Sequence, residues 1–320
     1  MLFQIIGFNY ASTMSCSICK SAAQVPVFIH TLEYSEWVLE NTQYGYLKCA
    51  NCGFLQCNPI PSNAVLFNYY QEQYAYDWFQ KNSLFKKWQA KHRHHKIRKY
   101  IQPTDKILDF GCGHGYFVQE LAGRGFQCFG FDIGSDKISH HQNGHINNKN
   151  TFQEYKEDGF DVITLWHVLE HMQNQHDILD QLKQKLKPGG KIIIAVPNTN
   201  SYAFKRLVQK WGWLQQPYVH INQYNPHNLS LLLEQHGWII EKLSTTDTWD
   251  QSIYDFLISL FFYKNKSRNT VRQFGENAGG SLFFRMNQLV RLLFAPISYM
   301  FSLLRKNKLE GNELLIVAYK

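Results

Sequence analysis

Three glycines at alternate positions are the first feature of this chain that could bind a ligand. They are Gly111, Gly113 and Gly115. The apolar run Ile107–Phe110 enters them and a helical pattern leaves them, which predicts a buried parallel strand, a tight turn and a helix start. A dinucleotide site needs a glycine where this chain has Tyr116, so the G-x-G-x-G spacing indicates a different ligand.

Acidic residues at the ends of two predicted strands indicate what that ligand carries. Asp109 stands directly before the glycine turn, where its charge suits a ligand with cationic groups. S-adenosylmethionine carries a sulfonium and an ammonium group, so we expect it as the cofactor. Asp132 ends the second strand, which begins at Gln127, and can accept both ribose hydroxyls. Trp166 ends the fourth strand and is a further candidate for cofactor contact.

Several histidines are expected near the same edge of the sheet. The strand 160–166 opens into His-Val-Leu-Glu-His, and ligands bind beyond the carboxyl ends of parallel strands. Histidine has a pKa near that needed to take a proton from a hydroxyl group. The candidate bases are His171, His167 and, from a later loop, His220; His227 is a further residue that could touch the acceptor. Glu170 could orient the base or share a metal with His171.

Two C-x-x-C pairs predict a zinc site. They are Cys16 with Cys19 and Cys49 with Cys52. Each pair can point two thiolates at one ion, and two pairs provide the four sulfur ligands that structural zinc prefers. Cys57 lies beyond the second pair and is not expected to be a ligand. Because sulfur would fill every position, we favour a structural role over that of a substrate-docking lid; separate reduced thiols are the alternative.

The segment 63–100 is expected to be helical and is both aromatic and basic. Its run 91–96 contains three histidines and three cations. Interleaved aromatic and basic residues could bind nucleic acid, but a helix that packs over an active site has the same composition. We expect the histidines to form a solvated helix face rather than a metal site. The formal charge of +8 allows an anionic partner without choosing one.

An insertion at 245–311 contains two apolar stretches, 254–263 and 282–304. The second is long enough for a membrane span, but Arg285, Arg291 and Pro296 interrupt it. Polar residues at helical spacing predict a pair of amphipathic helices instead. Basic residues flank both stretches, so the insertion could bind an anionic membrane surface; an intramolecular or dimer-forming cap is the alternative.

In this order, the motifs resemble class I S-adenosylmethionine-dependent methyltransferases. More narrowly, the chain resembles bacterial methyltransferases with an N-terminal zinc ribbon that occur in polysaccharide and cell-envelope biosynthesis. The resemblance rests on the C-x-x-C pairs and on L-D-F-G-C-G-H-G, G-F-D, F-D-V-I-T-L-W-H-V-L-E-H, L-K-P-G-G, V-P-N and H-I-N-Q-Y-N-P-H-N-L. It implies that Asp109 and the three glycines hold the methionine end of the cofactor and that Asp132 holds the ribose. The family includes relatives that act on sugars, quinones and lipids, so the acceptor stays open.

The expected architecture is an α/β fold with a Rossmann-like seven-stranded sheet whose last strand, Glu313–Tyr319, is antiparallel. We expect a zinc ribbon at 14–61, a helical linker or cap at 62–101, a methyltransferase domain at 102–244 and 312–320, and the helical insertion before the last strand. The apolar segment Met1–Thr13 has no basic region typical of a signal peptide, and Met14 is an alternative start.

We therefore expect methyl transfer from S-adenosylmethionine to a hydroxyl group or carbon of a small-molecule, glycan or lipid-linked acceptor, by in-line displacement with a histidine base. The alternatives are an RNA methyltransferase and a non-catalytic cofactor-binding or scaffold protein. The expected location is the cytoplasm, either free or peripheral at the inner face of the membrane.

Overall fold

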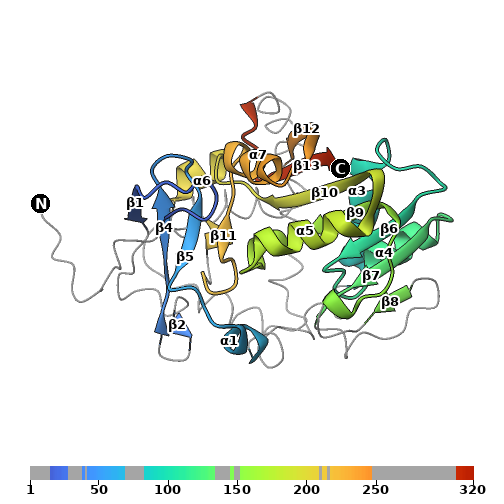
Figure 1. The fold of residues 1–320 in the computed structure, drawn as a ribbon, viewed down its shortest axis with the longest axis horizontal. Coiled ribbons are helices and arrows are strands. Elements are labelled where there is room, and N and C mark those ends of the chain that lie inside the picture. The colour runs from blue at the N-terminus through green and yellow to red at the C-terminus, as the bar shows by residue number, and fades with distance from the viewer. Residues whose placement is uncertain are drawn as a thin grey trace, which may run out of the picture.

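A computed structural model of the chain shows an α/β domain with a smaller antiparallel sheet beside it (Figure 1). The residues that the structure describes are 15–27, 38–39, 42–68, 83–133, 145–147, 152–208, 211–214, 217–246 and 308–320. The predicted insertion helices at 254–263 and 282–304 and the segment 1–14 lie outside these residues.

The larger sheet has seven strands in the order β12-β13-β10-β9-β6-β7-β8. Its members are β6 (Lys106–Phe110), β7 (Gln127–Phe131), β8 (His145–Asn147), β9 (Phe160–Trp166), β10 (Leu186–Pro197), β12 (Ile239–Thr246) and β13 (Glu313–Tyr319). The pairs from β8 to β10 are parallel, whereas β13 runs antiparallel to both β10 and β12. The predicted fold class is therefore confirmed.

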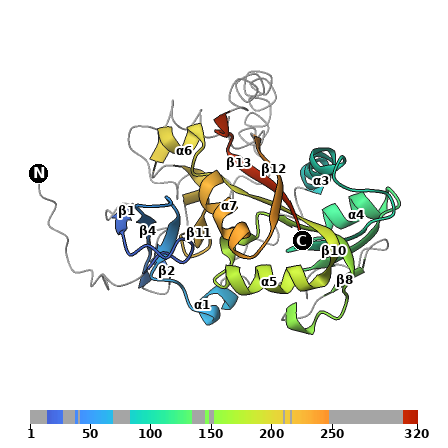
Figure 2. The ribbon, with the colours of Figure 1, turned by 45° about the horizontal axis from the view of Figure 1, so that its top comes forward.

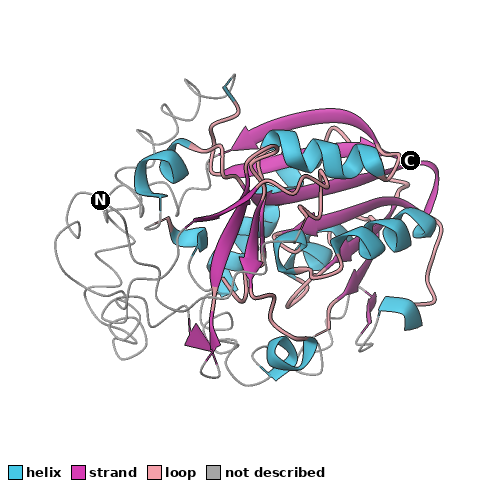
Figure 3. Cartoon of the chain, turned by 60° about the vertical axis from the view of Figure 1, so that its left-hand side comes forward, coloured by secondary structure: helices cyan, strands magenta, loops and turns pink. Residues whose placement is uncertain are grey.

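Helices cover both faces of this sheet (Figures 2 and 3). Successive residues of β10 point to opposite faces, so Ile192 and Ile194 join one hydrophobic core while Ile193 and Ala195 join the other. The first core packs against α5 (Gln175–Lys185) and α7 (Pro226–Gln235), and the second against α3 (Ser83–Ile97) and α4 (Tyr116–Ala122). Burial on both faces explains why the central strands are continuous apolar runs.

The smaller sheet is built mainly from the N-terminal part of the chain. Its order is β1-β4-β5-β11, and every pairing is antiparallel. The bounds are β1 Gln24–Val27, β4 Gly45–Cys49, β5 Leu55–Asn58 and β11 Asn222–Gln223, and a separate two-stranded ribbon pairs β2 Val38–Leu39 with β3 Thr42–Gln43. β11 pairs with β5 and directly precedes the N-cap region of α7. The small sheet is therefore joined to the large domain through the hydrogen bonds between β5 and β11 as well as through the chain.

Short helices complete the described part of the chain. They are α1 (Asn63–Asn68), α6 (Tyr202–Leu207) and the single 3-10 turns η4 (Phe152–Glu154), η5 (Leu169–His171) and η7 (Gly212–Leu214). Among the described residues, no helix is long and apolar enough to cross a membrane.

One strand begins earlier than its apolar pattern predicts. The pattern places the fifth strand at Ile192–Val196, with the Lys-Pro-Gly-Gly segment as a turn before it. In the structure, β10 already begins at Leu186, which pairs with Phe160 of β9 before an irregularity that ends at Lys191. The turn residues are thus a bulged start of the strand.

Candidate active site and metal centre

The glycine turn lies at the carboxyl end of β6, at the point where α4 begins. Gly111, Gly113 and Gly115 all have positive φ angles, of 75°, 51° and 71°, a conformation that costs other L-residues roughly 1–2 kcal/mol. The backbone N–H groups of Gly111 and Cys112 donate to the carbonyl oxygen of Phe131, at 2.7 and 3.0 Å. These hydrogen bonds fix the turn against the end of β7.

The glycines have different surroundings. A Cβ added at Gly111 would lie 2.3 Å from Cγ2 of Val168, so glycine is required here for packing. A Cβ added at Gly113 would meet no atom within 4 Å. Bare backbone beside open space is what a ligand needs to approach the main chain closely, so Gly113 is the candidate position for a cofactor cradle.

Asp132 lies at the end of β7 and faces this cradle. Its Oδ2 accepts a hydrogen bond of 2.8 Å from the backbone N–H of Gly113. The carboxylate therefore has two uses: it holds the glycine turn, and it stands where the ribose of an adenosyl group is expected. This is the position that the sequence predicts for it.

Asp109 is buried beneath the turn. Its side chain is 2% exposed, and Oδ1 accepts a hydrogen bond of 2.7 Å from the hydroxyl of Thr164 on β9. Oδ2 is buried and has no hydrogen-bond partner among the described residues. Burial, together with the charge of Asp132, raises the pKa of Asp109 to about 7, against the opposing effects of Arg93 and Thr164. A cationic ligand at this oxygen would stabilise the ionised form, so these residues fit S-adenosylmethionine.

Trp166 ends β9 with its side chain buried in the second core. Its ring packs edge-on against Phe117, with centroids 5.6 Å apart, and the guanidinium of Arg93 lies 5.2 Å from its centre. The indole Nε1 is buried and has no hydrogen-bond partner in the described part of the chain. Trp166 thus lies at the predicted edge of the sheet, with its ring packed in the core.

His167 follows Trp166 in a strained conformation, with φ of 57°. Its Nε2 lies 3.0 Å from Oε2 of Glu313, and its Nδ1 lies 3.4 Å from Oε1 of Glu170. The ring stacks on Trp213, with centroids 4.9 Å apart and planes 9° apart. Two carboxylates and an aromatic face therefore hold this imidazole in one orientation.

This environment favours the protonated form of His167. Burial alone would lower its pKa, but Glu170 and Glu313 overcome that effect and raise the pKa to about 9. Glu313 also pairs with Lys96 of α3, and its Oε1 accepts a hydrogen bond of 2.8 Å from Thr246. Burial alone would raise the pKa of Glu313, but Lys96 and His167 hold it well below its usual range.

His171 and His220 lie close together beside this ion-pair network. Their ring centroids are 4.9 Å apart, and the centroid of His220 is 5.6 Å from that of Trp213. Nδ1 of His171 lies 2.8 Å from the carbonyl oxygen of Val219. A carbonyl can only accept, so Nδ1 carries a hydrogen and the lone pair of the neutral ring is at Nε2.

Glu170 lies between His167 and His171. It is fully buried, and its Oε1 is 3.4 Å from Nδ1 of His167 and 3.9 Å from Nε2 of His171. Burial alone would raise its pKa, but His167, His171 and His220 together hold the pKa below its usual value. Glu170 is therefore placed to orient and stabilise a protonated histidine. His227, in contrast, is exposed on the first turn of α7.

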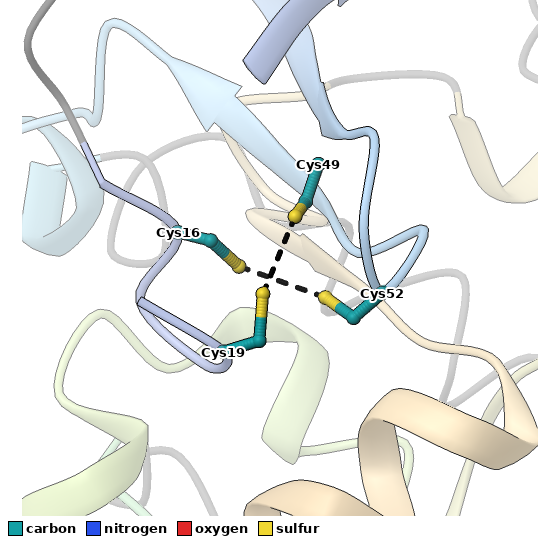
Figure 4. Close-up of side chains that lie close together, drawn as sticks. All are labelled: Cys16, Cys19, Cys49 and Cys52. Carbon is teal, nitrogen blue, oxygen red and sulfur yellow. Dashed lines mark hydrogen bonds between the residues drawn. The ribbon is translucent and has the colours of Figure 1, made fainter. Parts of the chain in front are cut away.

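The four predicted zinc ligands converge on one point (Figure 4). Their Sγ atoms all lie within 4.8 Å of one another, with Cys16–Cys52 at 3.7 Å and Cys19–Cys49 at 3.4 Å. A zinc ion with Zn–S bonds of about 2.3 Å needs tetrahedral sulfur–sulfur separations of about 3.8 Å, so the residues present fit zinc. The Sγ of Cys57 instead donates to the carbonyl oxygen of Pro59, at 3.2 Å.

Side chains of α5 and α7 hold the two cysteine turns against the large domain. Asn225 and Asn228 cap α7 reciprocally, and the Nδ2 groups of both donate to the carbonyl oxygen of Cys52, at 3.1 and 3.3 Å. Gln235 of α7 donates to the carbonyl oxygen of Ile18, at 3.0 Å. The four-cysteine cluster is therefore part of the packing of the large domain.

Comparison with known proteins agrees with this geometry. A family model described as "Methyltransferase domain" matches residues 70–243, which is more than half of the chain. The chain belongs to this methyltransferase family. The fold of the large domain is thereby accounted for.

Individual relatives of this methyltransferase are distant. A ubiquinone biosynthesis O-methyltransferase of Glaesserella parasuis is 30% identical over 117 aligned positions, and the match covers 32% of this chain and 50% of that protein. The protein of the same name from Leptothrix cholodnii is 29% identical over 110 aligned positions, and the match covers 31% of this chain and 47% of that protein. The chain thus spans about half the length of the curated relatives it matches. A solved S-adenosylmethionine-dependent methyltransferase from Archaeoglobus fulgidus is 18% identical, with a TM-score of 0.47 over 81% of this chain and all of that one.

Sequence patterns did not reveal three residues that shape this site. Glu313, Lys96 and Trp213 come from β13, α3 and η7, and each is separated from His167 by many residues. The one available signal was Glu313 itself, a charged residue that opens an otherwise apolar strand.

Proposed function

We propose that this methyltransferase transfers the methyl group of S-adenosylmethionine to a hydroxyl group of a small-molecule, glycan or lipid-linked acceptor. The observation that carries the proposal is the pairing of an open glycine cradle with a histidine of defined tautomer at the same edge of the sheet. The glycine cradle fits the methyl donor, and the histidine fits the removal of a hydroxyl proton.

Four groups of the chain would hold the cofactor. The backbone at Gly113 would lie against it, Asp132 would accept its ribose hydroxyls, and the orphaned Oδ2 of Asp109 would face its positive charge. Trp166 would support the site from below. When bound, S-adenosylmethionine supplies a methyl group that its sulfonium already activates. The protein then has to align the acceptor and exclude water, and alignment can lower a barrier by roughly 7–11 kcal/mol.

We assign the role of the general base to His171. In the neutral form its Nδ1 donates to Val219, so Nε2 can take the proton of a hydroxyl group. Glu170, whose Oε1 is 3.9 Å from that nitrogen, would stabilise the imidazolium that forms. His220 packs beside His171 and would orient the acceptor.

His167 has a different role in this proposal. An imidazole with a pKa of about 9 is already protonated at neutral pH and cannot serve as a base. It would act as a fixed cation that keeps Glu170 ionised and presents the face of Trp213 to the site.

The acceptor class rests on the relatives and on the resemblance seen in the sequence. The curated relatives are O-methyltransferases by name, which favours a hydroxyl group over carbon. The zinc-ribbon pattern favours an acceptor from polysaccharide or cell-envelope biosynthesis. We place the reaction in the cytoplasm, where four thiolates stay reduced, and we assign the zinc a structural role because no sulfur position is left for a substrate.

Labelled methyl transfer tests the function directly. The protein is incubated with methyl-labelled S-adenosylmethionine and with fractionated lipids, glycans, small molecules and RNA from a bacterial extract. Label in a lipid, glycan or small-molecule fraction supports the proposal. Label confined to RNA would identify an RNA methyltransferase, and label in no fraction, with the cofactor bound, would identify a non-catalytic binding protein.

The role of His171 is tested with a matched pair of variants. His171→Gln should lower kcat strongly and leave the affinity for S-adenosylmethionine unchanged, whereas His227→Gln, at an exposed position of α7, should change neither. A His171→Gln enzyme with full kcat would remove this histidine from the mechanism.

A further inference from the structure

One face of α3 has a surface that the methyl-transfer proposal does not use. Seven exposed residues recur along this helix and its C-terminal turn at spacings of three and four. They are Leu84, Lys87, Trp88, Lys91, His95, Arg98 and Lys99. At 3.6 residues per turn, these positions fall within a stripe of about 120°, so they share one side of the helix.

The other side of α3 faces the protein. Ala90, Arg93 and Ile97 lie opposite the stripe: Ala90 and Ile97 join the second core, and Arg93 lies over Trp166. The helix packs beside α4 at the outside of the molecule (Figure 2). The exposed stripe is therefore not explained by contacts with the core.

The stripe is basic along its length and has two apolar side chains at one end. Four of its residues are lysine or arginine, and α3 contains no acidic residue. At its N-terminal end, the aliphatic side chain of Leu84 is 81% exposed and the indole of Trp88 is 40% exposed. Exposed leucine and tryptophan beside a row of cations are complementary to a surface with anionic groups above an apolar layer.

We infer that the stripe on α3, residues 84–99, is a docking site for an anionic lipid surface. Leu84 and Trp88 enter the boundary between headgroups and acyl chains, and the four cations contact lipid phosphates. An exposed leucine contributes nothing to phosphate binding in a nucleic acid, whereas it can enter the apolar layer of a membrane. This observation favours a membrane over RNA.

Docking would bring the active site to the membrane. Lys96 of the same helix pairs with Glu313, which holds His167, so the helix that carries the stripe also contacts the site. The inference concerns the surface alone and does not depend on methyl transfer.

Vesicle flotation tests the inference with the full chain. Wild type should float with vesicles of phosphatidylcholine and phosphatidylglycerol and stay behind with phosphatidylcholine alone. Each basic side chain near an anionic surface contributes roughly fivefold to binding. Charge reversal at three positions, Lys87→Glu, Lys91→Glu and Arg98→Glu, should therefore abolish flotation. Leu84→Ser should weaken it without changing the charge.

A second triple variant serves as the control. Lys48→Glu, Lys156→Glu and Lys242→Glu reverse three exposed charges on other parts of the chain and should preserve flotation. Circular dichroism and thermal unfolding establish that both variants fold. The inference is overturned if wild type does not float, if the α3 variant still floats, if the control loses binding equally, or if RNA binding at physiological salt replaces lipid binding.

Discussion

Nε2 of His167 lies 3.0 Å from a carboxylate oxygen of Glu313, a residue that follows it by 146 positions in the chain. This contact joins the segment after β9 to the last strand of the sheet. Glu313 also pairs with Lys96 of α3, so one buried carboxylate connects three elements around the site. The imidazole of His167, one of the candidate bases, is thereby held beside two carboxylates.

Replacement of Glu313 by glutamine should lower the pKa of His167. Glutamine has nearly the same volume but no charge, so one of the two carboxylates that raise this pKa is removed. Nuclear magnetic resonance titration of the His167 ring measures the change. Glu157→Gln, which alters an exposed ion pair with Lys106, is the control and should leave the titration unchanged. An unaltered His167 titration in Glu313→Gln would contradict the assignment.

Protein stability should fall as the pH rises from 7 toward 9. His167 has a folded pKa of about 9, above its ordinary value of 6.5, so its ion pairs stabilise the fold fully below about 6.5 and are lost as pH rises through 9. Asp109, with a folded pKa of about 7, opposes folding increasingly as pH rises from about 4 to 7 and adds little beyond. The slope between pH 7 and 9 should approach roughly 1.4 kcal/mol per pH unit.

Urea unfolding at a series of pH values measures this slope. His167→Gln removes the titrating group and should flatten the curve above pH 7, whereas His95→Gln, at an exposed position of α3, should not. Equal slopes in wild type and His167→Gln would mean that another group is responsible.

The two glycines at the turn should respond differently to alanine. Gly113→Ala should cost roughly 1–2 kcal/mol of stability for its positive φ, and its added methyl group should block the cofactor. Gly111→Ala should cost roughly 2–5 kcal/mol, because strain is added to a clash with Val168. Denaturant unfolding and cofactor binding, measured on both variants, separate the effects. A Gly113→Ala protein that binds the cofactor normally would place the cradle elsewhere.

Loss of one sulfur ligand should release the metal. Cys52→Ser should purify without the one zinc ion per chain that wild type is expected to hold, and its thermal midpoint should fall. Hydrogen exchange should rise at the start of α7, because Asn225 and Asn228 are bonded to the Cys52 carbonyl. Cys57→Ser is the matched control and should keep its zinc. Metal analysis that finds equal zinc in both variants would refute the ligand set.

Local patterns predicted those parts of the fold that depend on neighbouring residues. The apolar runs at β6, β7, β9 and β13 gave strand bounds within one residue of those observed, because both faces of these strands are buried. The two C-x-x-C turns are also local features, and the structure brings their four sulfur atoms together. Such signals need no knowledge of distant contacts.

Features that depend on distant partners were not predicted. Strand β11, Asn222–Gln223, is polar and two residues long, and it exists because it pairs with β5. The raised pKa of His167 depends in part on Glu313, and the position of Arg93 over Trp166 depends on how α3 packs. The choice among histidines in the site therefore required the three-dimensional contacts.

The central claim is that the glycine cradle between Asp109 and Asp132 binds S-adenosylmethionine. Calorimetric titration of the purified chain with this molecule tests it most directly, with Asp132→Asn and Asp132→Ala as variants. We predict one site in wild type, weaker binding in Asp132→Asn, which keeps an acceptor for Gly113 but loses the charge, and the weakest binding in Asp132→Ala. Absence of binding by folded wild type, or equal affinity in all three proteins, would contradict the account.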